Sequence, residues 1–176
     1  MTTSRLARTG RIFTSRLATL ARLLETAGEQ WRDAGGLDML LQARLAEDMF
    51  PLPYQIVFTC DQPNQFAAWC LGESFVRTDP ATLGWSQLTA HIAATAAYVE
   101  RATGTADDAA LDRDRRVDLI DGMYLELSGA DYVDEWLMPN FYFHLVTAYD
   151  LLRMKGIRIG KADYMAHLVD RIQRQA

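Results

Sequence analysis

The sequence contains few cysteines and histidines and no long hydrophobic run, and each shortage excludes a class of protein. Its 176 residues include two cysteines, Cys60 and Cys70, and three histidines. If both cysteines lie on one straight helix, their ten-residue separation is about 15 Å, beyond the reach of a disulfide bond. Two unpaired thiols are typical of a reducing compartment, so we expect a cytoplasmic protein.

Other classes are excluded by motifs that the chain lacks. No apolar run approaches the roughly 20 residues that a membrane-spanning helix needs, so we expect no membrane partner. We find no secretory signal, Gly-rich phosphate loop, paired-cysteine zinc motif or Gly-x-Ser-x-Gly elbow. The net charge of −5 gives no reason to expect a nucleic-acid partner.

One basic segment stands apart from this acidic balance. Residues 1–24 contain five arginines and no acid, giving a charge of +5, and the remainder carries −10. Such a segment can be a targeting peptide. However, apolar residues recur at helical spacing through it and into the acidic half, which favours the first structural helix.

What is present indicates one all-α domain spanning residues 1–176, with 49% hydrophobic and 23% charged residues. Helical periodicity predicts four long helices at about 9–33, 53–71, 82–104 and 133–155. Asp121-Gly122, between two short β-prone runs, predicts a hairpin, and residues 105–116 read as a solvated linker. Residues 164–173 predict a tail helix. The economical architecture is an antiparallel four-helix bundle with a hairpin before the last long helix.

The segment from Met138 to Gly156 combines the strongest helical pattern with the best candidate for a chemical site. Asn140 and His144 lie four residues apart on its apolar face. Pro139 cannot donate a backbone hydrogen bond, so we expect the helix to kink or restart one residue before Asn140.

This segment also resembles a known family. In His144-Leu-Val-Thr-Ala-Tyr-Asp-Leu-Leu-Arg-Met-Lys-Gly156, the Leu-Leu-Arg and Gly positions match the closing motif of the DinB/YfiT-like helical-bundle superfamily. Residues 44–51, 139–144 and 156–163 resemble three blocks of an uncharacterised branch, domain of unknown function 1993. The resemblance extends from about residue 10 to residue 165.

The resemblance implies an antiparallel four-helix bundle that is often a homodimer. Better-known members hold a divalent metal with three histidines, two from a His-x-x-x-His on the last long helix and one from the second helix, and some act as thiol-dependent transferases or isomerases. Here Asn140 stands in place of the first paired histidine, and the second helix offers Gln55 or Asp61 but no histidine. The three-histidine centre therefore cannot be assembled from matching positions.

Two interpretations of His144 remain open. His144, Asn140 and Asp61 could form a mixed nitrogen and oxygen shell for a labile divalent ion such as Zn, Ni or Mn. Alternatively, His144 is a core residue, and Asn140 only bonds backbone carbonyls freed by Pro139.

A ligand pocket is a further possibility for the same region. Its candidate lining residues are Asn140, Tyr149, Phe141 and Gln55, although aromatic clusters are more often core or dimer interface. Three functional classes follow. They are a small-molecule-binding bundle that has lost its metal, a metal-dependent enzyme using His144 as ligand or general base with Asp61, and a structural dimer module.

Overall fold

The four long amphipathic segments form the four long helices that their periodicity predicts. The computed structural model describes residues 4–32 and 36–173. The predicted end of the first helix at Asp33 lies outside the described residues. The long helices are α1 (Arg5–Trp31), α3 (Leu52–Leu71), α4 (Trp85–Thr105) and α6 (Met138–Met154).

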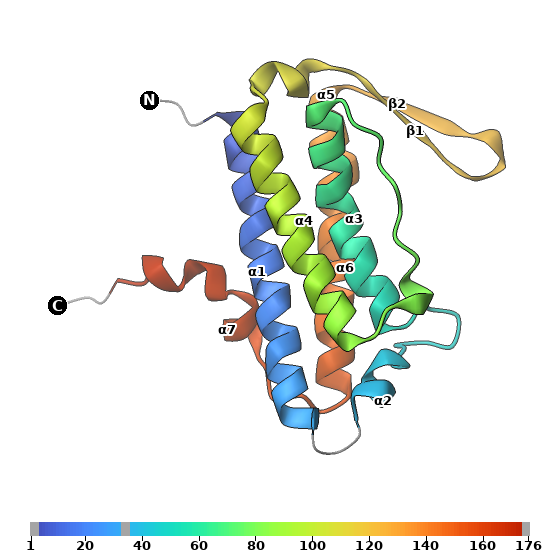
Figure 1. Cartoon of the computed structure of the whole chain (residues 1–176), viewed down its shortest axis with the longest axis vertical. Helices are drawn as coiled ribbons and strands as arrows, with labels where there is room; N and C mark the ends of the chain where they lie inside the picture. The colour runs from blue at the N-terminus through green and yellow to red at the C-terminus, as the bar shows by residue number, and fades with distance from the viewer. Residues whose placement is uncertain (1–3, 33–35, 174–176) are drawn as a thin grey trace.

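The helices run in two opposed pairs (Figure 1). Helices α1 and α6 run one way and α3 and α4 run the other, because residues 72–84 return along the length of the bundle before α4 begins. Helix α3 packs closely against both α4 and α6, and α1 packs mainly against α4. The predicted helical bundle is confirmed, and its α3–α6 pair is the one that carries the candidate site.

Three aromatic rings, one from each of three long helices, pack against one another in the core. Phe13 of α1 lies with its ring centroid 5.4 Å from that of Phe66 of α3 and 5.0 Å from that of Phe141 of α6. All three side chains are fully buried. Burying each ring contributes about 1.5–3 kcal/mol, so this triad is a substantial part of what holds the helices in register.

The predicted solvated linker has a structural role at the end of α1. Within it, η3 (Asp108–Asp112) places the Asp108 carboxylate over the first turn of α1, where it accepts hydrogen bonds from the backbone N–H groups of Arg5 and Leu6. These donors have no partner inside the helix. The linker prediction was therefore incomplete.

The predicted hairpin is confirmed. Strand β1 (Arg115–Asp118) pairs antiparallel with β2 (Tyr124–Leu127). The turn between them, η4 (Ile120–Gly122), holds Asp121 at φ 56° and Gly122 at φ 72°, the left-handed conformations that Asp-Gly supplies at low cost. The hairpin extends outward from the end of the bundle rather than covering it (Figure 1).

The predicted restart at Pro139 is not seen, because the backbone stays helical through it and only changes from π-helical to α-helical geometry at Met138. Helix α5 (Gly129–Asp131) continues into a π-helical segment, η5 (Tyr132–Leu137), and α6 begins at Met138. The π-helical turn before Pro139 changes the hydrogen-bonding pattern at the point where proline supplies no N–H donor. Helix α3 likewise stays helical through Pro63.

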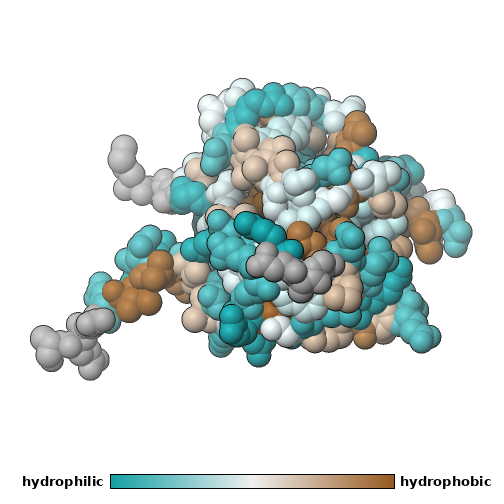
Figure 2. Space-filling view, turned by 60° about the horizontal axis from the view of Figure 1, so that its bottom comes forward, coloured by the Kyte–Doolittle hydropathy of each residue, from teal (hydrophilic) through white to brown (hydrophobic). Residues whose placement is uncertain are grey.

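The C-terminal segment is not the single helix that we predicted. It consists of α7 (Lys161–Tyr164) and a 3-10 helix, η6 (Ala166–Arg171), separated at Met165. The segment projects from the bundle with hydrophobic side chains at its surface (Figure 2), among them Leu168, Val169 and Ile172. Its tertiary contacts are mainly with α1, and Tyr164 packs against Tyr149 of α6. No helix of the described residues has the length and apolar character needed to cross a membrane.

Candidate functional site

A hydrogen bond between α3 and α6 sets the position of His144. Nδ1 of His144 lies 2.8 Å from Oε1 of Gln55. The Gln55 amide is itself oriented, because its Nε2 donates to the Phe50 carbonyl at 3.0 Å. An oxygen facing the ring requires Nδ1 to carry the proton when the imidazole is neutral. Nε2 of His144 is then an acceptor.

Burial keeps this imidazole neutral. It lowers the pKa of His144 to about 4, because the charged ring loses solvation in its half-buried position. Nε2 makes no hydrogen bond to another described residue, and it is accessible to solvent. At neutral pH His144 therefore offers one solvent-facing lone pair.

Aromatic side chains surround His144. The rings of Phe58 and Phe143 meet the imidazole edge-on, each with a centroid separation of 5.1 Å. We call His144, Gln55, Phe58 and Phe143 the His144 cluster. Phe58 continues it along α3, since its ring meets that of Tyr54 at 5.9 Å. Phe143 is 59% exposed, so the cluster opens to the surface.

Asp61 has a different partner from the one that the sequence suggested. Its Oδ2 accepts a hydrogen bond from Nε of Arg77 at 3.1 Å, and Arg77 lies in the segment that returns between α3 and α4. The carboxylate is 1% exposed, and its Oδ1 has no hydrogen-bond partner among the described residues. Burial raises the pKa of Asp61 to about 6, although Arg77 acts in the opposite direction.

The other predicted site residues make their contacts with partners other than His144. Asn140 donates from Nδ2 to the Trp136 carbonyl at 2.7 Å. This is a local backbone bond of the kind considered for Asn140, although the carbonyl that Pro139 leaves without its donor is that of the preceding residue, Glu135. Phe141 is fully buried in the core. Tyr149 packs against Tyr164 at 5.8 Å and borders a hollow of about 150 Å³.

The described residues, 4–32 and 36–173, show no metal centre built from three of the usual His, Cys, Asp or Glu ligands. The side-chain nitrogen of Asn140 is engaged by its own helix, and one oxygen of Asp61 is engaged by Arg77. The proposed His144, Asn140 and Asp61 shell stays a prediction.

Sequence reasoning missed two contributors to this region. Phe58 lies one helical turn from Gln55, so helical spacing could have placed it beside His144. Arg77 gave no such signal, because it lies in a segment without periodicity. Its guanidinium carbon lies 5.8 Å from the Phe58 ring centroid, which connects the Asp61 ion pair to the His144 cluster.

The arrangement is that of a DinB-like helical bundle. Two helix pairs run in opposite directions, and His144 on the last long helix, α6, faces the second long helix, α3. A crystal structure of a DinB family member from Shewanella denitrificans matches the chain with a TM-score of 0.67 and 25% sequence identity, covering 92% of this chain and 95% of that one. The family model "Domain of unknown function (DUF1993)" matches residues 7–165. The chain belongs to the DUF1993 family. No curated protein matches the sequence.

Proposed function

We propose that the protein binds a small molecule at the His144 cluster and holds no stoichiometric metal there. The observation that carries this proposal is the neutral imidazole of His144, with its lone pair open to solvent between two aromatic rings. A ligand with a hydroxyl or amine donor and an apolar body meets both features, because the donor binds Nε2 and the body packs against the rings.

The geometry of Gln55 supports a binding role for His144. A side-chain amide fixed by a backbone carbonyl holds the imidazole in one orientation and one tautomer. A preoriented acceptor loses less conformational entropy when a ligand arrives. The proposed specificity is therefore for hydrogen-bond donors and against acceptors and anions.

Phenol tests this proposal, because it combines a hydroxyl donor with an aromatic body. We expect phenol to shift the ring ¹⁵N resonance of His144 Nε2 saturably at pH 7, with Nδ1 protonated before and after the titration. Anisole, which lacks the donor, should bind at least tenfold more weakly, since a lone acceptor left unpaired costs about 1–3 kcal/mol.

Two histidine variants supply the control. His144→Ala should abolish the saturable change, followed through the aromatic resonances of Phe58. His91→Ala should leave binding unchanged, because His91 is also half-buried but lies on α4 outside the cluster. Equal binding of phenol by both variants would contradict the proposal.

A metal-dependent or general-base enzyme is the second candidate. The buried Asp61 favours it, because a carboxyl with a pKa near 6 and one unpartnered oxygen can exchange a proton near neutral pH. Against it, Arg77 covers that carboxyl, and a pKa near 4 makes His144 a weak base. Enzymatic turnover that depends on both Asp61 and His144 would favour this candidate.

Two broader inferences accompany the proposed function. Cys60 and Cys70 are both free and buried, which supports a reducing cytoplasmic location. Exposed aromatic side chains, Phe50 and Phe143 among them, support a homodimer. A purely structural dimer module is the third candidate, and it predicts no ligand at the His144 cluster.

A further inference from the structure

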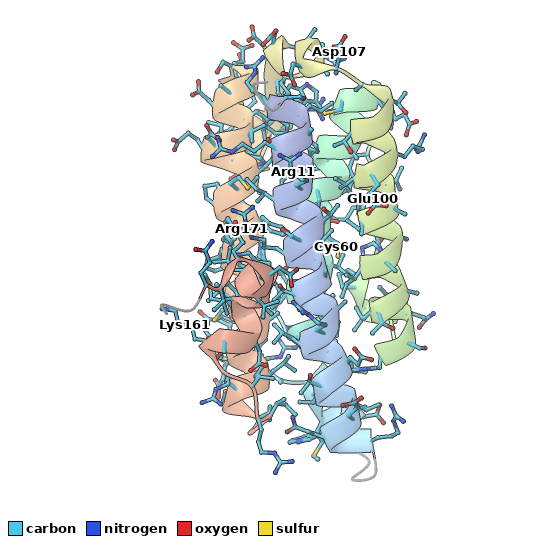
Figure 3. All side chains as sticks on the ribbon, turned by 90° about the vertical axis from the view of Figure 1, so that its left-hand side faces the viewer. Arg11, Cys60, Glu100, Asp107, Lys161 and Arg171 are labelled. Atoms are coloured by element: carbon cyan, nitrogen blue, oxygen red, sulfur yellow. The ribbon has the colours of Figure 1, made fainter. Side chains whose placement is uncertain are left out.

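A basic groove lies between the N-terminal half of α1 and the C-terminal η6. It has a volume of about 520 Å³. Arg11 of α1 and Arg171 of η6 lie on the face where these two elements meet (Figure 3). Arg8 and Arg16 also line it, so four arginines from two distant parts of the chain border one hollow. None of the acidic residues that the structure describes is part of its lining.

These four arginines are not neutralised by ion pairs within the part of the chain that the structure describes. Ion pairs there use other arginines, namely Arg5, Arg77, Arg101 and Arg116. Four like charges around one hollow repel one another, and the protein as a whole is acidic, with a net charge of −5. Concentrating the arginines here is therefore unfavourable unless an anion joins them.

Two neutral side chains in the groove add hydrogen-bonding capacity. The Ser15 hydroxyl accepts a hydrogen bond from Nη1 of Arg16 at 2.8 Å, which holds that guanidinium at the groove wall. His167 faces the arginines from η6. Burial and the charge of Arg16 lower the pKa of His167, and the Tyr164 carbonyl acts in the opposite direction.

We propose that the basic groove binds the phosphate group of a small-molecule ligand. Guanidinium groups bind phosphate oxygens through paired, charge-assisted hydrogen bonds, and several of them converge on the groove. This site goes beyond the proposed function and is independent of it, because the groove shares no residue with the His144 cluster.

The neighbouring cleft indicates the rest of the ligand. A hollow of about 440 Å³ between α1 and η5 shares Arg8 and Ile12 with the basic groove. Its wall includes apolar side chains such as Val133 and Met138. A phosphate ester with an apolar or aromatic body can place its phosphate among the arginines and its body in this cleft. Phenyl phosphate should therefore bind more tightly than inorganic phosphate.

Calorimetric titration of the full chain with pyrophosphate and phenyl phosphate tests the proposal. We expect saturable binding of both, and at least tenfold weaker binding by the double variant Arg11→Gln/Arg171→Gln. Arg32→Gln is the matched control, since Arg32 is an exposed arginine at the opposite end of α1. Its affinity should equal that of the original protein. Thermal melting verifies that the variants fold.

Two further measurements can overturn the proposal. Bound pyrophosphate should raise the pKa of His167, followed by NMR, because a nearby anion favours the protonated ring. An unchanged pKa would place any bound anion elsewhere. Sedimentation with phosphatidic-acid vesicles distinguishes a lipid headgroup from a free ligand. Co-sedimentation without pyrophosphate binding would overturn the small-molecule assignment, and so would equal affinities of the double variant and Arg32→Gln.

Discussion

Burial acts on Asp61 and His144 in the same sense, because it favours the neutral form of each side chain. The pKa of Asp61 rises to about 6 and that of His144 falls to about 4. The difference between the two lies in their partners. Asp61 faces a cation, Arg77, and His144 faces a neutral amide, Gln55. The first arrangement tolerates a charge, and the second leaves a lone pair on Nε2 of His144.

Asp61→Asn should stabilise the protein at pH 7.5. Because the folded-state pKa of Asp61 lies above its ordinary value of 3.8, the folded protein binds more protons than the unfolded chain between about pH 4 and pH 6. Stability from this carboxyl is thus lost as the pH rises through that window. The amide avoids this loss, so we expect a gain of roughly 1–3 kcal/mol in the free energy of unfolding.

The gain should fade toward pH 4, where Asp61 is protonated anyway. Urea denaturation at pH 4.5 and pH 7.5 measures both values. Asp48→Asn serves as the control, since Asp48 is an exposed acid, and it should change neither value appreciably. A loss of stability at pH 7.5 would mean that the ion pair with Arg77 outweighs the desolvation of Asp61.

The sequence could predict part of this site. Asn140 and His144 were identified as polar residues on an apolar helix face, which a period of 3.6 residues reveals, and Gln55 was identified only as a replacement for the family's histidine on the second long helix. Their partners could not be predicted, because whether His144 meets Gln55 or Asp61 depends on the axial offset between α3 and α6. That offset is set by packing, including the contacts of Phe13 with Phe66 and Phe141.

At the scale of elements, short connections fix where the long helices begin. Gly129 starts α5 directly against η3, and a Cβ atom added there would lie 1.9 Å from the Leu111 carbonyl oxygen. Gly129 is therefore a close-approach position between the two segments that lead into α6. Asp108 of the same η3 caps α1, so this one contact region links the starts of two long helices.

Gly129→Ala should lower the free energy of unfolding by roughly 1–3 kcal/mol, because η3 or α5 must move to admit the methyl group. Gly104→Ala supplies the comparison. A Cβ atom at Gly104, within α4, meets no atom within 4 Å, and alanine is the better helix former, so that variant should be slightly more stable. Equal denaturation midpoints for the two variants would contradict the close-approach assignment.

Element types were easier to predict than element directions. Helical periodicity identified α1, α3, α4 and α6, and Asp121-Gly122 identified the hairpin. The parallel course of α3 and α4 required knowing that residues 72–84 span the bundle. Thirteen extended residues reach about 43 Å and a 20-residue helix is about 30 Å long, so the length permits the crossing without requiring it.

At the scale of the whole molecule, the basic groove and the His144 cluster lie on different elements. The arginines of the basic groove gather at α1 and η6, and the His144 cluster lies between α3 and α6. The two proposed ligand sites therefore lie on different elements, one at α1 and η6 and the other at α3 and α6. The proposal that the His144 cluster holds no stoichiometric metal separates the preferred function from a metal-dependent enzyme.

Metal stoichiometry tests that central claim most directly. The purified chain is dialysed separately against Zn²⁺, Ni²⁺ and Mn²⁺ at pH 7.5, and bound metal is measured by elemental analysis for the original protein and His144→Ala. We predict clearly less than one ion per chain and no difference between the two proteins, because no three His, Cys, Asp or Glu side chains of the described residues come together as a metal site. One tightly held zinc or nickel ion per chain, lost in His144→Ala, would contradict the account.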